Sequence, residues 1–78
     1  MPIDIRIPDV GENVTQATIV QWHRKVGERI DAGQPLVDIM TDKVTVEVEC
    51  PESGVLLEIL HGPDEELRVG TVIGRIGN

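Results

Sequence analysis

The chain repeats its own pattern of apolar residues after a shift of 37 positions. AGQPLVDI at residues 32–39 falls on VGTVIGRI at residues 69–76, so that Ile39 matches Ile76. A chance match between small apolar residues is the alternative, but the ungapped run over residues 17–39 favours duplication. A half-unit used twice predicts two similar four-stranded units related by a pseudo-two-fold axis.

Each half reads as strands, because apolar residues alternate with polar ones at the period of two that marks a half-buried strand. The core must be built from Val, Ile and Leu, since Trp22 is the one aromatic residue. No window of helical length carries a sustained apolar stripe. We predict one all-β domain over residues 1–78, a flattened β-barrel or sandwich of two four-stranded antiparallel sheets. The expected strands lie in residues 3–7, 18–22, 37–39, 44–50, 55–60 and 71–76.

Charge and cysteine usage limit the partners. A net charge of −7 argues against nucleic acid and anionic membrane, which both attract positive charge. No apolar run reaches about 18 residues, and no secretory or transit signal is visible. Cys50 is the single cysteine, which indicates a reducing compartment. We expect a monomer in the cytoplasm, or in the mitochondrial matrix if a transit peptide has been removed from a eukaryotic protein.

A tight turn at Asp42-Lys43 joins the two halves. A two-residue loop there pairs Thr41 with Val44, Ile39 with Val46 and Val37 with Val48, and we expect these side chains to face inward. Asp-Lys does not favour the positive φ of the usual hairpin turns, so a type I turn suits it better. The tip carries one of only two lysines, the other being Lys25.

The duplication also predicts where the ends of the chain lie. The symmetry equivalent of the Asp42-Lys43 turn is the gap between the two termini, so the termini should lie side by side at the opposite pole. The first half carries an inserted loop, residues 9–16, where the second half needs only Glu52-Ser53. We expect that loop beside Lys43.

Simpler interpretations of these residues exist. Lys43 can be one solvated charge, and the acidic patch formed by Asp38, Asp42, Glu47 and Glu49 can serve solubility or dock a basic groove. No catalytic motif is present, and the glycines follow no phosphate-loop pattern. The two histidines, at positions 23 and 61, have no recognisable ligand spacing, so no metal site is predicted.

The turn resembles the lipoyl attachment site of the lipoyl domains of 2-oxo acid dehydrogenase complexes. Those domains carry a (T/S)-D-K-(A/V) turn, and this chain has TDKV at residues 41–44 followed by TVEV. IPDVGENV at residues 7–14 resembles the family's opening, and the resemblance covers essentially all of the chain. Asn13 stands where the family often has Gly, and HGPDEELRVG lacks the usual Glu-Gly-Asp. The implied architecture is the biotinyl/lipoyl carrier fold.

The resemblance implies that Lys43 carries lipoic acid in amide linkage and that the domain performs no bond chemistry itself. It implies that the lipoyl group accepts an acyl group from a thiamine-dependent 2-oxo acid decarboxylase and passes it to coenzyme A in an acyltransferase catalytic core. It also implies that dihydrolipoamide dehydrogenase then reoxidises the dithiol. Thr41, Asp42 and Val44 would be read by the lipoate attachment enzyme. The expected partner-recognition loop comprises Asp9, Val10, Gly11, Glu12, Asn13, Val14 and Thr15.

Two alternatives remain open. Biotin carrier domains share the architecture but surround the lysine with methionines, as in A-M-K-M, whereas Asp42 and Val44 flank Lys43 here. From another class comes an unmodified acidic β-sandwich that binds a partner through its surface. The Met40-Thr41-Asp42-Lys43 wording favours a branched-chain or pyruvate-type complex, and a 2-oxoglutarate complex remains open.

Overall fold

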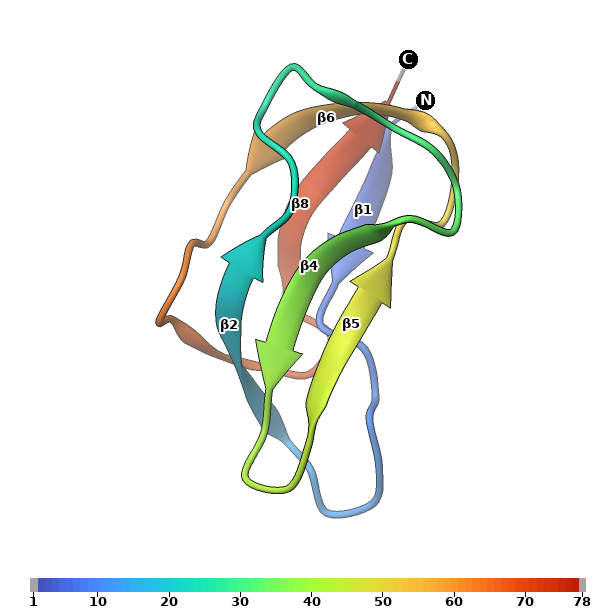
Figure 1. The fold of residues 1–78 in the computed structure, drawn as a ribbon. Helices are drawn as coiled ribbons and strands as arrows, with labels where there is room; N and C mark the ends of the chain where they lie inside the picture. The colour runs from blue at the N-terminus through green and yellow to red at the C-terminus, as the bar shows by residue number, and fades with distance from the viewer. Residues whose placement is uncertain (1, 78) are drawn as a thin grey trace.

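The computed structural model describes residues 2–77, which form eight strands and no helix. These residues therefore include no helix that could cross a membrane. Two four-stranded antiparallel sheets result, with strand orders β1-β8-β6-β3 and β5-β4-β2-β7, and the all-β prediction is confirmed (Figure 1). The strands are β1 (Ile3–Arg6), β2 (Gln16–Trp22), β3 (Arg29–Ile30), β4 (Pro35–Met40), β5 (Thr45–Glu49), β6 (Gly54–Ile59), β7 (Glu66–Arg68) and β8 (Val72–Gly77).

The internal repeat is visible in the strands themselves. β4 and β8 are offset by the 37 residues of the sequence shift, and each occupies the same place in its sheet, between β5 and β2 or between β1 and β6. A register shift between Ile19 and Gln21 has its counterpart between Leu56 and Glu58, again 37 residues on. The pseudo-two-fold arrangement is therefore present down to the bulges, which bend a strand and move later side chains to the other face.

The core lies between the two sheets and is formed by matching residues of the two halves. Leu36 and Ile73 are both 0% exposed, and Ile39 and Ile76 are 0% and 1% exposed. Trp22 is half-buried and packs against the core. Its indole nitrogen donates a hydrogen bond of 2.9 Å to the carbonyl oxygen of His61, which satisfies the polar end of the ring.

The Trp22 ring depends on a glycine beneath it. A β-carbon added at Gly74 would lie 2.8 Å from Cη2 of Trp22 and 2.8 Å from the carbonyl oxygen of Glu58. Such contacts are too short for any side chain, so glycine is required at this point of β8.

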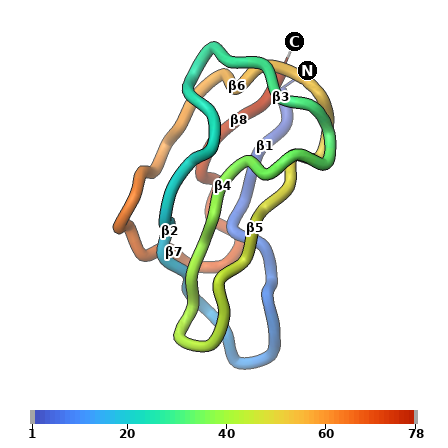
Figure 2. Tube along the Cα trace, viewed as in Figure 1, coloured from blue at the N-terminus to red at the C-terminus, as the bar shows by residue number. Residues whose placement is uncertain are grey.

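The molecule has two distinct poles. The β4–β5 hairpin and the connection from β1 to β2 project at one end, and both chain ends lie at the other (Figures 1 and 2). Ile3 pairs with Ile76 in the sheet, and a β-carbon placed on Gly77 would lie 3.7 Å from Cα of Pro2. The predicted placement of the chain ends opposite the Asp42-Lys43 turn is thus confirmed for the described residues.

Candidate cofactor-attachment site

The β4–β5 hairpin has the predicted register. Ile39 pairs with Val46 and Met40 with Thr45, and the N–H of Thr41 donates a 2.8 Å hydrogen bond to the carbonyl of Val44. Among residues 2–77, positive φ outside glycine occurs only at Asn13 and Asp64. The turn at Asp42-Lys43 therefore uses no left-handed residue, as expected from its side chains.

The Thr41 side chain fixes the backbone of the turn. Its hydroxyl oxygen accepts hydrogen bonds from the backbone N–H groups of Lys43, at 3.2 Å, and Val44, at 3.1 Å. The same hydroxyl lies 3.2 Å from the carbonyl oxygen of Val44, to which it donates. A short polar side chain that bonds backbone groups two and three residues on stabilises a turn without help from glycine. Thr41, half-buried, thus has a structural part in presenting the lysine.

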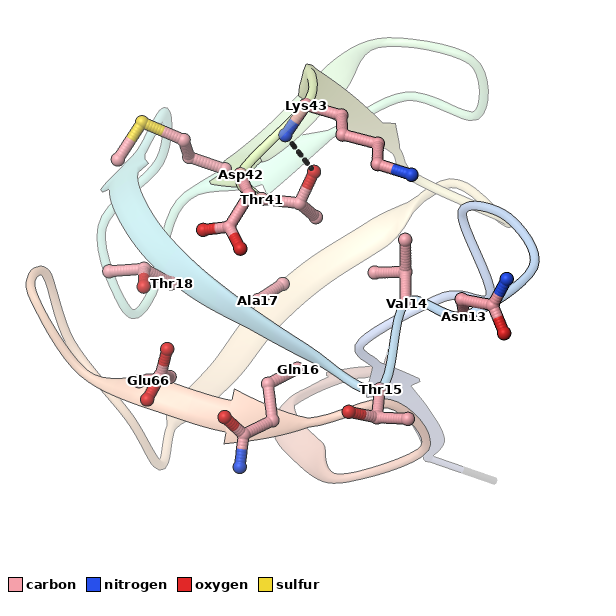
Figure 3. Close-up of a pocket in the computed structure, with 11 residues that line it drawn as sticks. Asn13, Val14, Thr15, Gln16, Ala17, Thr18, Thr41, Asp42, Lys43 and Glu66 are labelled. Carbon is pink, nitrogen blue, oxygen red and sulfur yellow. Dashed lines mark hydrogen bonds between the residues drawn. The ribbon is translucent and has the colours of Figure 1, made fainter.

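The Lys43 side chain is exposed and extends from the tip toward the loop that holds Val14 (Figure 3). Within residues 2–77 no carboxylate lies in ion-pair distance of its ammonium group. An exposed primary amine without an ionic partner fits a covalent attachment point, because both a modifying enzyme and a long substituent need access to it.

The inward orientation predicted for Val44 is wrong. Val44 and its neighbour Met40 are each 47% exposed. The hairpin tip extends past the strands of the opposing sheet (Figure 1). Lys43 and its neighbours in the chain, Asp42 and Val44, are therefore all exposed.

A cleft of about 220 Å³ separates the hairpin from the loop that follows β1. Its presence confirms that part of the inserted loop lies beside Lys43. Residues of β2 and β7 also line the cleft, because the pairing of these strands places Thr18 opposite Glu66. The sequence patterns did not predict that β2 and β7 contribute. The lining residues are Asn13, Val14, Thr15, Gln16, Ala17, Thr18, Met40, Thr41, Asp42, Lys43 and Glu66.

The loop itself is held by local hydrogen bonds. The N–H of Gly11 donates to the Asp9 carboxylate at 3.1 Å, and the N–H of Val14 donates to the carbonyl of Gly11 at 3.4 Å. Asn13 has φ of 64°, a conformation that glycine adopts freely and asparagine tolerates. The position of Asn13 would therefore accept glycine with the same backbone conformation. Of the expected recognition residues, Val10 and Val14 are half-buried, while the exposed ones are Asp9, Gly11, Glu12, Asn13 and Thr15.

The other departure from the family pattern, in residues 61–70, forms an ordered turn. Asp64 supplies its left-handed residue with φ of 70°. The Glu65 carboxylate accepts a 2.6 Å hydrogen bond from the N–H of Gly62 and lies 2.9 Å from Nδ1 of His61. These two hydrogen bonds, that with His61 first, lower the pKa of Glu65.

The eight-stranded flattened barrel presents the Lys43 amine at the pole opposite its chain ends, an arrangement that suits a carrier domain. Residues 3–76 match the Biotin_lipoyl family, described as biotin-requiring enzyme, and the chain belongs to this family.

The relatives are components of two kinds of complex. The chain is 43% identical over 75 residues to the dihydrolipoyllysine-residue acetyltransferase component of pyruvate dehydrogenase complex from Corynebacterium glutamicum, covering 96% of this chain and 11% of that protein. It is 42% identical over 76 residues to the dihydrolipoyllysine-residue succinyltransferase component of 2-oxoglutarate dehydrogenase complex from Bartonella vinsonii, covering 97% and 18%. The chain thus spans less than a fifth of the length of these curated relatives.

A solved structure agrees with the fold. The lipoyl domain of the 2-oxoglutarate dehydrogenase complex from Azotobacter vinelandii superimposes with a TM-score of 0.81 at 34% identity, over 97% of this chain and 96% of that one. The chain is therefore similar to a lipoyl domain over 97% of its length.

Proposed function

We propose that the chain is the lipoyl domain of the acyltransferase component of a 2-oxo acid dehydrogenase complex, with lipoic acid in amide linkage to Lys43. The carrying observation is the exposed, unpaired Lys43 amine in a Thr-Asp-Lys-Val turn whose backbone is fixed by Thr41. Lys43 would hold lipoic acid, whose disulfide would supply a redox-active acceptor for an acyl group.

The residues of the domain present and deliver this group. The Thr41 hydroxyl holds the turn in one conformation, which offers Lys43 at a fixed place to the attachment enzyme, and Asp42 and Val44 flank it for recognition. Attachment at one pole and the chain ends at the other give the arm its greatest reach. Tethering to the same assembly raises the local concentration of a carried acyl group to about the mM range for short flexible linkers.

The partners in this proposal are a thiamine-dependent decarboxylase, the acyltransferase catalytic core and dihydrolipoamide dehydrogenase. Residues 9–15 are the contact surface for the decarboxylase, supported by the exposure of five of the seven and by the position of residues 13–15 across the cleft from Lys43. The presence of a single cysteine, Cys50, supports a reducing compartment, the cytoplasm or the mitochondrial matrix.

The attachment is tested by intact mass. The chain is produced with a lipoate attachment enzyme and lipoate, alongside the variants Lys43→Arg and Lys25→Arg. A lipoyl mass gain that is present in wild type and Lys25→Arg but absent in Lys43→Arg supports the proposal. A biotin gain in a host with biotin ligase instead would assign the chain to the biotin-carrying members of its family, and no gain at all would indicate an unmodified interaction module.

The particular complex is a finer question. The sequence of residues 40–43, Met-Thr-Asp-Lys, supports a pyruvate or branched-chain complex, although the relatives include both acetyl- and succinyltransferases. Purified decarboxylases for pyruvate, branched-chain 2-oxo acids and 2-oxoglutarate would each be mixed with the lipoylated domain and their radiolabelled substrate. We expect label on the domain with pyruvate or a branched-chain acid, and faster labelling with 2-oxoglutarate would reverse this assignment.

A further inference from the structure

The pseudo-two-fold symmetry places two rows of polar side chains in equivalent positions on the outer faces of the sheets. In one sheet the row runs across β1, β8 and β6 and consists of Asp4, Arg75 and Glu58. In the other it runs across β5, β4 and β2 and consists of Glu47, Asp38 and Gln21. The residues of the two rows occupy equivalent positions on equivalent strands, so the charges in one row can be compared directly with those in the other.

In the first row a cation joins two carboxylates. Nε of Arg75 donates to Asp4 at 2.9 Å and its Nη1 donates to Glu58 at 2.6 Å. Both acids raise the pKa of the guanidinium, and the hydrogen bond to Asp4 is the largest single cause. Acids on both strands that flank β8 are therefore compatible with the sheet here, because the central residue carries the opposite charge.

The second row has an acid at its centre. Asp38 lies directly opposite Glu47, and like charges in that position destabilise a sheet. Within residues 2–77 no Lys or Arg forms an ion pair with either carboxylate. The one basic group at this place is His23, just after β2, whose Nε2 lies 2.9 Å from Oδ1 of Asp38. The bulge in β2 brings Gln21 to the same face, where its amide donates to Asp38 at 3.4 Å.

We propose that His23, Asp38 and Glu47 form a binding site for a divalent transition-metal ion such as Zn²⁺, independent of the lipoyl function. One ring nitrogen and two carboxylate oxygens, one from each residue, lie within 4.8 Å of one another. Zinc accepts this mixture of imidazole nitrogen and carboxylate oxygen, and three protein ligands leave a further position for water.

The geometry requires only small movements. Two ligands at zinc bonding distance around a tetrahedral ion lie about 3.3 Å apart. The His23–Asp38 pair is already near that separation, and the exposed Glu47 side chain is free to move toward it. Asp38 on β4 and Glu47 on β5 are paired across the two strands, so their backbones are fixed opposite each other before a metal binds. This arrangement favours binding.

The second histidine provides a matched control. His61 also pairs with a carboxylate, with Nδ1 lying 2.9 Å from Glu65, and it is half-buried like His23. No third ligand of the described residues joins that pair. A metal that binds any histidine–carboxylate pair would bind at both His23 and His61. A metal that requires the third ligand would bind only at His23.

The test is a Zn²⁺ titration of the ¹⁵N-labelled chain in the Lys43→Arg background, which carries no dithiol that could chelate the metal. We expect saturable binding of one ion, with amide shifts centred on His23, Asp38 and Glu47. Loss of an outer-shell partner typically lowers metal affinity about 10- to 100-fold, so losing a direct ligand in His23→Asn or Glu47→Gln should lower it at least about tenfold. His61→Asn should leave it unchanged.

Dispersed amide spectra of the metal-free variants establish that they fold, and Asp38→Asn provides a third substitution if one of them does not. Absence of saturable binding overturns the proposal, as does affinity that is retained in both His23→Asn and Glu47→Gln. Equal losses in His23→Asn and His61→Asn would also overturn it, because they would show general histidine binding.

Discussion

The side-chain oxygen of Thr41 accepts a hydrogen bond from the backbone N–H of Lys43 at 3.2 Å, so the lysine is positioned by a neighbour rather than by its own side chain. Thr41→Val keeps the shape and removes this bond together with that from Val44. We expect the free energy of unfolding to fall by about 1 kcal/mol. Urea unfolding measures this loss, and faster amide exchange at residues 43 and 44 locates it.

The exposed Thr45 gives the control for that substitution, because it lies on the same strand pair without a side-chain hydrogen bond in the described structure. Thr45→Val should leave exchange at residue 43 unchanged. Equal effects of the two substitutions would show that the Thr41 hydroxyl does not fix the turn.

Asn13 is predicted to be replaceable by glycine but not by alanine. Its φ of 64° lies in the left-handed region, which costs a residue with an ordinary β-carbon roughly 1–2 kcal/mol. Asn13→Ala should therefore lower the free energy of unfolding by about 1 kcal/mol, and Asn13→Gly should be near neutral. Denaturant unfolding of both variants checks this, and equal stability of the two would contradict the conformational explanation.

The two halves are predicted to contribute alike to the core. Ile39 and Ile76 occupy equivalent, buried positions, and truncation of either to alanine should cost about 2–5 kcal/mol. Met40→Ala, at a 47% exposed position next to Ile39, should change stability by about 0.5 kcal/mol or less. Unfolding in urea compares the three. If an alanine variant does not fold, the valine variants should each lose about 0.5–1.5 kcal/mol.

Gly74→Ala should destabilise the chain by about 1–3 kcal/mol, because the added methyl group meets Trp22 and the carbonyl of Glu58 at 2.8 Å. Gly62→Ala is the control, since nothing lies within 4 Å of a β-carbon there. A blue or red shift of the Trp22 fluorescence in Gly74→Ala alone would report displacement of the indole. Equal stability of the two variants would show that β8 moves to accommodate the methyl group.

Acid should weaken the turn that holds Glu65. Hydrogen bonds from His61 and Gly62 lower the pKa of this carboxyl group in the folded state, so the stabilisation is present above the unfolded pKa. It is lost as the pH falls through the lower, folded pKa. In Glu65→Gln the decline of stability in acid should be shallower. An NMR titration should also find the Glu65 midpoint raised in His61→Asn, and an unchanged midpoint would exclude the proposed cause.

The hairpin and the placement of the loop were predictable because both follow from periodicity. Alternation fixed which residues of β4 and β5 pair, and the 37-residue shift placed the chain ends and residues 9–16 at opposite poles. Val44 was predicted to face inward but is exposed. Alternation indicates which residues share a face of a strand, but it does not indicate where the opposing sheet ends.

Other features depend on contacts between residues far apart in the sequence. Strands β3 and β7 have two and three residues, too few to show a period, although Ile30 and Leu67 in them match under the repeat. The grouping of His23 with Asp38 depends on the bulge after Ile19, because strict alternation carries no signal for an extra residue. The contact between Trp22 and Gly74 was also not predictable from alternation, because it connects β2 of one sheet with β8 of the other.

Duplication of a half-unit has a consequence for how such a domain could arise. Joining two copies head to tail creates a single internal junction and leaves one pair of free ends, and the symmetry axis sends them to opposite sides. In this chain the junction between the two halves corresponds to the Lys43 turn, and Pro2 and Gly77 approach one another at the other pole. An ancestral fusion event would therefore have separated the site of chemical loading from the site of attachment to a larger polypeptide before selection acted on either.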